Sequence, residues 1–135
     1  MMDVLVIDDE GDVRDALRRV LERAGFHVRV AGTGADALAE IRRAGVDVVV
    51  TDIIMPGIGG VETIGTIREE FPGVRIIAIS GGGNFGAGAY QPNAITTSAY
   101  LAAANRAGAH HVLTKPFDTA DLLQAIGQYS AVGHA

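Results

Sequence analysis

Short runs of β-branched and apolar residues alternate along this chain with stretches in which apolar residues recur at a helical period. The runs predict five strands, at residues 4–7, 26–30, 46–50, 74–79 and 111–114. Three of them are almost continuously apolar, which is typical of parallel strands that are covered on both faces. The run at 26–30 instead alternates apolar and polar residues, which predicts a strand at the edge of the sheet.

The stretches between these runs predict helices. Each places its apolar residues on one helical face: Val13, Leu17, Val20 and Leu21; Leu38 and Ile41; Val61, Ile64 and Ile67; and Leu122, Leu123 and Ile126 behind a candidate N-cap at Asp118. The tripeptide Arg-Ala-Gly occurs at 23–25, 43–45 and 106–108, each time before a strand, and we interpret it as a helix end with a left-handed glycine. Alternating strands and helices predict an α/β fold with a parallel sheet covered by helices on both faces.

Length and composition narrow the classes of protein. The chain has 135 residues, 48% of them hydrophobic, which fits one globular domain. It has no cysteine, which excludes disulfides and thiolate metal sites, and its net charge of −5 argues against a nucleic-acid surface. The longest apolar run, residues 99–104, is far too short to cross a bilayer, and the acidic start does not resemble a secretory signal. We therefore expect a soluble, cytoplasmic domain.

Polar residues follow four of the predicted strands. Asp8, Asp9 and Glu10 follow the first, Asp52 the third, Ser80 the fourth, and Lys115, the only lysine, the fifth. The carboxyl ends of parallel strands form one edge of the sheet, where ligands bind. Two carboxylates ~4 Å apart repel by about 4 kcal/mol at an effective dielectric constant near 20, so a cluster of acids needs a cation. Oxygen ligands favour Mg²⁺, and with a serine and a lysine they suit phosphoryl transfer to an aspartate.

Each of these residues also has an ordinary structural explanation. A carboxylate after a strand is most often the N-cap of a helix, Ser80 before three glycines is a common turn residue, and the single lysine is consistent with a bias in composition. The joint occurrence of these residues at four strand ends favours a functional site.

Four segments, in order, carry a resemblance to a known family. They are residues 4–10 (VLVIDDE), 52–57 (DIIMPG), 79–81 (ISG) and 115–117 (KPF). Over residues 2 to about 128 the chain resembles the receiver domain of two-component response regulators, especially the single-domain members. The resemblance implies a flavodoxin-like, doubly wound sheet with strand order 2-1-3-4-5.

The resemblance also implies a role for each site residue. Asp52 is the phospho-acceptor, and Asp9 and Asp52 hold Mg²⁺ directly. Asp8 assists through water, and the main-chain carbonyl of Ile54 is a further ligand. Ser80 and Lys115 contact the phosphoryl group. The implied partners are a sensor histidine kinase or a histidine phosphotransfer protein and an unknown downstream protein, with no direct binding of nucleic acid and no membrane insertion. The protein is then a signalling protein that at most assists its own phosphotransfer and autodephosphorylation, not an enzyme.

Two features depart from the family pattern. Val112 stands three residues before Lys115, where the family usually has Tyr or Phe, so rotation of an aromatic ring cannot report phosphorylation at that position. The segment between Ser80 and Lys115 is also longer than usual, and it predicts a long glycine-rich loop at 81–97. We expect the receiver domain to span residues 1–128, with a short tail at 129–135. The chain is then either a complete single-domain protein or a fragment of a longer regulator.

Two alternative functions remain open. The first is a pseudo-receiver, a protein-interaction module that is never phosphorylated; retention of the five pocket side chains argues against it. The second is nucleotide binding at residues 81–86, which match G-x-G-x-x-G but lack an acidic residue within about 20 positions.

Overall fold

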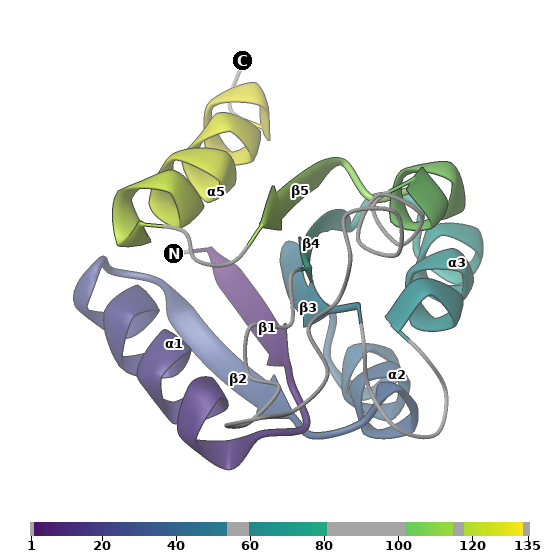
Figure 1. The fold of residues 1–135 in the computed structure, drawn as a ribbon, viewed down its shortest axis with the longest axis horizontal. Helices are drawn as coiled ribbons and strands as arrows, with labels where there is room; N and C mark the ends of the chain where they lie inside the picture. Colours follow the sequence, from purple (N-terminus) through teal and green to yellow (C-terminus); the bar gives the residue numbers. More distant parts are fainter. Residues whose placement is uncertain (1, 54–59, 81–101, 115–117, 134–135) are drawn as a thin grey trace, which may run out of the picture.

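A computed structural model describes residues 2–53, 60–80, 102–114 and 118–133 of the chain. Its centre is a sheet of five parallel strands in the order β2-β1-β3-β4-β5 (Figure 1). The strands are β1 (Asp3–Ile7), β2 (His27–Ala31), β3 (Val48–Asp52), β4 (Arg75–Ser80) and β5 (His111–Thr114). The predicted α/β class, the strand order and the edge position of the alternating strand are confirmed.

Helices cover both faces of the sheet. They are α1 (Gly11–Arg23), α2 (Gly34–Arg43), α3 (Gly60–Glu70) and α5 (Thr119–Gly133), and residues 102–107 are also helical. α1 and α5 lie on one face, and α2, α3 and the helical segment 102–107 lie on the other (Figure 1). In the described part of the chain, no helix combines the length and the apolar character that a bilayer-spanning segment needs.

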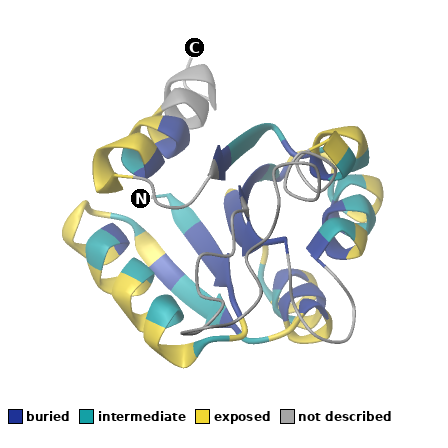
Figure 2. Cartoon of the chain, in the orientation of Figure 1, coloured by how far each residue is buried: buried dark blue, intermediate teal, exposed yellow. Residues whose placement is uncertain are grey.

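The sheet separates two hydrophobic clusters because successive side chains of a strand point to opposite faces. In β1, Leu5 and Ile7 belong to the cluster beneath α2 and α3, whereas Val4 and Val6 belong to the cluster beneath α1 and α5. The three central strands are buried over most of their length, with Asp3 and Arg75 at the starts of β1 and β4 partly exposed, whereas β2 is exposed over more of its length (Figure 2). This difference explains why β1 and β3 read as continuous apolar runs and β2 as an alternating one.

Several element ends differ from the sequence prediction by one or two residues, for identifiable reasons. Phe26 precedes β2 because its amide donates to the carbonyl of Leu21 at the end of α1. Val74 precedes β4 because its amide donates to the carbonyl of Phe71. These residues complete helix ends before the chain enters the sheet.

The Arg-Ala-Gly interpretation is correct at two of its three sites. Gly25 has φ +99° and Gly108 has φ +121°, in the left-handed region that favours glycine. Gly45 does not have a positive φ, and the interpretation is wrong there, because α2 ends at Ala44 in an extended conformation. A helix that leaves in an extended conformation requires no left-handed residue.

The last described element of the chain is α5, which continues to Gly133 and thus passes through residue 128 without a break. The carbonyl of Asp118, the candidate N-cap, accepts hydrogen bonds from the amides of Asp121 and Leu122 in the first turn of α5. The loop expected at 81–97 lies outside the described residues.

Candidate functional site

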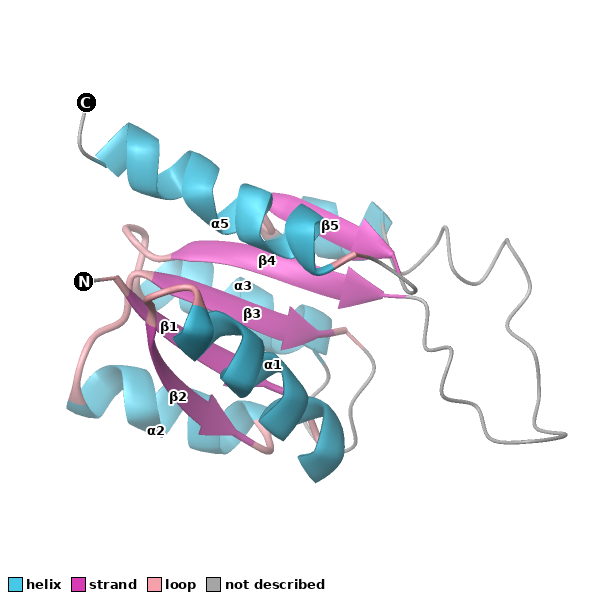
Figure 3. Cartoon of the chain, turned by 90° about the vertical axis from the view of Figure 1, so that its left-hand side faces the viewer, coloured by secondary structure: helices cyan, strands magenta, loops and turns pink. Residues whose placement is uncertain are grey.

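The carboxyl ends of all five strands lie along one edge of the sheet, as Figure 3 shows by the common direction of the arrows. Asp8 directly follows β1, and Asp52 and Ser80 are the last residues of β3 and β4. Pairing of β1 with β3 sets Ile7 opposite Thr51, and the residue that follows each of them along the chain is an aspartate. The register of two apolar strands therefore positions both acids.

Three carboxylates converge at this edge. Ligand atoms of Asp8, Asp9 and Asp52 all lie within 4.8 Å of one another. Asp8 and Asp52 are buried, with exposed fractions of 2% and 5%, whereas Asp9 is exposed. At this separation each pair of charges repels by about 3 kcal/mol at an effective dielectric constant near 20. A cluster of this kind favours a cation, and three carboxylates without histidine or cysteine fit Mg²⁺.

Asp8 is held by its main chain and by its side chain. Its amide donates to the carbonyl of Ala31 at 3.1 Å, which extends the pairing of β1 with β2 by one residue. Its carboxylate accepts the amide of Glu10 at 2.9 Å, and its carbonyl accepts Nη1 of Arg14 at 2.8 Å. The N-cap of α1 is Glu10, without a side-chain hydrogen bond, so Asp8 is not the cap residue of this helix.

The main chain just after Asp52 is fixed by two hydrogen bonds of Ile53. The amide of Ile53 donates to the carbonyl of Ile79 in β4, and the carbonyl of Ile53 accepts the amide of Gly60, the first residue of α3. A Cβ atom on Gly60 would lie 2.3 Å from the carbonyl oxygen of Asp52 and 2.5 Å from Cα of Ile53. Only glycine permits α3 to begin so close to the acid.

The sequence prediction for the site is only partly described by the structure. Asp8, Asp9 and Asp52 come together, and the main chain of Ser80 ends β4 at the same edge. Ile54 and Lys115 lie outside the described residues. Val112 is partly buried in β5 and packs against the cluster beneath α2 and α3.

Sequence reasoning did not find Arg14 or Gly60. Arg14 lies in the first turn of α1, where a basic side chain opposes the helix dipole. Gly60 begins α3, where a polar N-terminal residue is more usual. At both positions the available sequence signal was a residue type that is unfavourable near the N-terminus of a helix. Neither residue lies at a regular spacing from the aspartates.

His110 lies at the opposite end of β5 from the acids, just before its first residue. Its Nδ1 accepts the main-chain amide of Ile76 at 3.1 Å, and its own amide donates to the carbonyl of Ile76. Burial lowers the pKa of His110, and the charges of Arg68 and Arg75 lower it further. The neutral ring is therefore the form that joins β4 to β5.

Comparison with known proteins identifies the family. The family model "Response regulator receiver domain" matches residues 4–127. An uncharacterized 14.6 kDa protein of Leptolyngbya boryana is 36% identical over 128 residues, which cover 95% of this chain and 89% of that protein. The DNA-binding transcriptional regulator NtrC of Bradyrhizobium is 30% identical over 93% of this chain, but the chain spans only 23% of that protein.

Solved structures agree with the family model. The receiver domain of NtrX from Brucella abortus superposes with a TM-score of 0.79 at 29% identity, covering 94% of this chain and 97% of that domain. A response regulator receiver domain protein from Clostridium thermocellum gives a TM-score of 0.78 at 28% identity, with 96% and 94% covered. Receiver domains are signalling modules that are phosphorylated with Mg²⁺ at an acidic pocket, and this chain has three acids at the corresponding edge of the same fold. The chain belongs to the family of receiver domains of two-component response regulators.

Proposed function

We propose that this protein is phosphorylated on Asp52, in a reaction that requires Mg²⁺, and that phosphorylation changes its binding to a downstream protein. The observation that carries the proposal is the convergence of the Asp8, Asp9 and Asp52 carboxylates within 4.8 Å on a receiver fold. The phosphoryl donor is the phosphohistidine of a sensor kinase or of a histidine phosphotransfer protein.

The proposed cation ligands are Asp9, Asp52 and the carbonyl of Ile54, with Asp8 acting through water. When bound, Mg²⁺ neutralises the charge that gathers on the phosphoryl oxygens. An oxygen of Asp52 forms the bond to phosphorus as the bond to the donor nitrogen breaks, and the imidazole leaves. Asp52 suits this role because the last residue of a buried strand is rigidly placed.

Ser80 and Lys115 complete the proposed site. The hydroxyl of Ser80 donates a hydrogen bond to the phosphoryl group, and Lys115 contributes a compact positive charge. Both follow from the family pattern, and the position of Ser80 at the end of β4, beside β3, supports its part.

The test is labelling by a small phosphodonor such as acetyl phosphate, with and without Mg²⁺, measured on intact protein by mass spectrometry. We expect the wild type to gain one phosphoryl group only with Mg²⁺, and Asp52→Asn to gain none. Asp15→Asn is the matched control, because Asp15 is an exposed aspartate on α1, and it should be labelled like the wild type. Full labelling of Asp52→Asn would refute the assignment of the acceptor.

An unlabelled wild type would instead support a pseudo-receiver that acts only through protein binding. Circular dichroism of each variant verifies that the fold is retained, so that a missing label is not confused with unfolding.

A further inference from the structure

Arg14 connects the acidic edge to a neighbouring loop. Its guanidinium donates from Nη1 to the carbonyl of Asp8 at 2.8 Å. It also lies against Gly32 in the loop between β2 and α2, where a Cβ atom would be 3.0 Å from Nη1. The side chain of Arg14 thus extends from the first turn of α1, past the end of β1, to the loop between β2 and α2.

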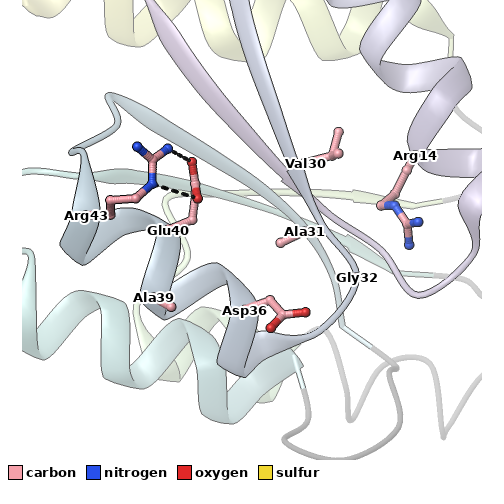
Figure 4. Close-up of a pocket in the computed structure, with 8 residues that line it drawn as sticks. All are labelled: Arg14, Val30, Ala31, Gly32, Asp36, Ala39, Glu40 and Arg43. Carbon is pink, nitrogen blue, oxygen red and sulfur yellow. Dashed lines mark hydrogen bonds and ion pairs between the residues drawn. The ribbon is translucent and has the colours of Figure 1, made fainter.

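The surroundings of Arg14 are open on one side. It lines a pocket of about 440 Å³ together with residues from the end of β2 and from α2 (Figure 4). Glu40 and Arg43, both on α2, pair with each other on the side of the pocket away from Arg14. Within the described parts of the chain, Arg14 forms no ion pair, although arginines elsewhere on α1 and α2 do. Its charged group is therefore used on a main-chain carbonyl rather than on a carboxylate.

This use is unusual for a basic residue in the first turn of a helix, where its charge opposes the helix dipole. The effect of this bond is to hold the main chain of Asp8 in place. Asp8 is buried, and its amide and carboxylate are already fixed by Ala31 and Glu10. The bond from Arg14 fixes the remaining polar group, the carbonyl, and that carbonyl belongs to the peptide that leads into Asp9.

We propose that Arg14 is a positioning residue for cation binding and phosphorylation: it sets the main chain at Asp8–Asp9 so that both carboxylates face Asp52. Arg14 contacts neither the cation nor the phosphoryl group. The inference rests on the proposed function, because it assigns Arg14 to the same site. Groups that hold metal ligands in place typically contribute about 10-fold or more to metal affinity.

The sign of the effect separates positioning from charge. Removing a positive charge near a cluster of acids would, by electrostatics alone, strengthen the binding of a cation. Losing the correct position of two ligands would weaken it. A weaker affinity for Mg²⁺ in a variant that lacks Arg14 therefore has only the positional explanation, provided that the variant is folded.

The experiment compares Arg14→Ala with Arg18→Ala by calorimetric titration with Mg²⁺ alone. Arg18 is one turn further along α1, half exposed and paired with Glu22, so its removal changes the net charge equally but leaves Asp8 untouched. We expect the Kd for Mg²⁺ to rise about 10-fold in Arg14→Ala and to stay within about twofold in Arg18→Ala. Urea unfolding of each variant, without Mg²⁺, gives the folded fraction under the conditions of the titration.

An unchanged or lower Kd in folded Arg14→Ala would overturn the inference, while a wild type that binds Mg²⁺ and is labelled on Asp52 would leave the proposed function in place. A wild type that neither binds Mg²⁺ nor is labelled would refute the proposed function, and the inference with it. Arg14→Lys adds a second readout. Lysine keeps the charge but has no planar group to lie on Gly32 and reach the carbonyl, so we expect it to restore less than half of the lost binding free energy. Full restoration by lysine would also overturn the positional role.

Discussion

Replacing Gly60 by alanine would bring a Cβ atom too close to the main chain of Asp52 and Ile53 at the end of β3. The added Cβ would lie 2.3 Å from the carbonyl oxygen of Asp52 and 2.5 Å from both Cα and the carbonyl oxygen of Ile53. All three neighbours are main-chain atoms, so no flexible side chain can move aside. Either α3 or the end of β3 must shift.

The size of the shift follows from these contacts. An ordinary carbon–oxygen contact requires the Cβ and the oxygen of Asp52 to separate by about 1 Å more than the present backbone allows. Overpacking of this kind typically costs about 1–3 kcal/mol of unfolding free energy. A displacement of about 1 Å at a reacting group can reduce the rate about 100-fold. We therefore expect Gly60→Ala to be less stable and to be labelled much more slowly on Asp52.

The assay combines urea unfolding with the initial rate of labelling by acetyl phosphate at saturating Mg²⁺, corrected for the folded fraction. The same helix provides the control, because a Cβ on Gly65 would meet no atom within 4 Å. Gly65→Ala should gain about 0.5–1 kcal/mol of stability from reduced backbone entropy, with no change in the labelling rate.

Two results would refute the reasoning. Wild-type stability in Gly60→Ala would mean that the close approach of α3 to β3 is not a constraint. Lower stability with an unchanged labelling rate of the folded fraction would mean that Gly60 supports the fold without positioning Asp52.

Three further predictions concern the rest of the molecule. The pKa of His110 is lower in the folded state than in the unfolded chain, so the contribution of its neutral ring to stability is present above the unfolded pKa and is lost as the pH falls through the folded pKa. The unfolding free energy should therefore decrease from about pH 7 to about pH 5, with a smaller slope in His110→Gln. Equal slopes for the two proteins in urea titrations would contradict this prediction. Gly25→Ala should lose about 1–2 kcal/mol in the same assay, because alanine is strained at φ +99°, and a stabilised variant would contradict the left-handed helix end. Arg42→Ala should leave the unfolding free energy almost unchanged, because its two bonds to Glu70 lie at an exposed surface. A clear loss of stability would mean that this pair joins α2 to α3 more strongly than exposed pairs usually do.

Much of the fold was predictable because the apolar pattern follows directly from burial. Leu5 and Val6 face different clusters, and the strand that contains them is buried on both faces, so it reads as an unbroken apolar run. The convergence of Asp8 and Asp52 was equally predictable, since strand ends in a parallel sheet meet at one edge. These inferences need only periodicity and topology.

The remaining features depend on close contacts that have no sequence period. The bond from Arg14 to Asp8 and the approach of Gly60 to Asp52 depend on where α1 and α3 begin relative to the ends of β1 and β3, which the apolar pattern does not specify. The conformation of Gly45, just after the end of α2, was predicted wrongly for a related reason. The same tripeptide leaves two helices through a left-handed glycine and the third in an extended path, according to where the next strand lies.

The sheet divides the hydrophobic interior into two clusters, and this division affects how substitutions in the two clusters combine. Ile64 on α3 and Ile126 on α5 belong to different clusters, with the sheet between them, and the two clusters share no side chain among the described residues. The free-energy costs of substitutions on opposite faces should therefore add, with little epistasis. A lineage can therefore change the apolar packing of one face while the other face keeps its sequence, provided that Arg14 on α1 and Gly60 on α3, which contact the acidic edge, are retained.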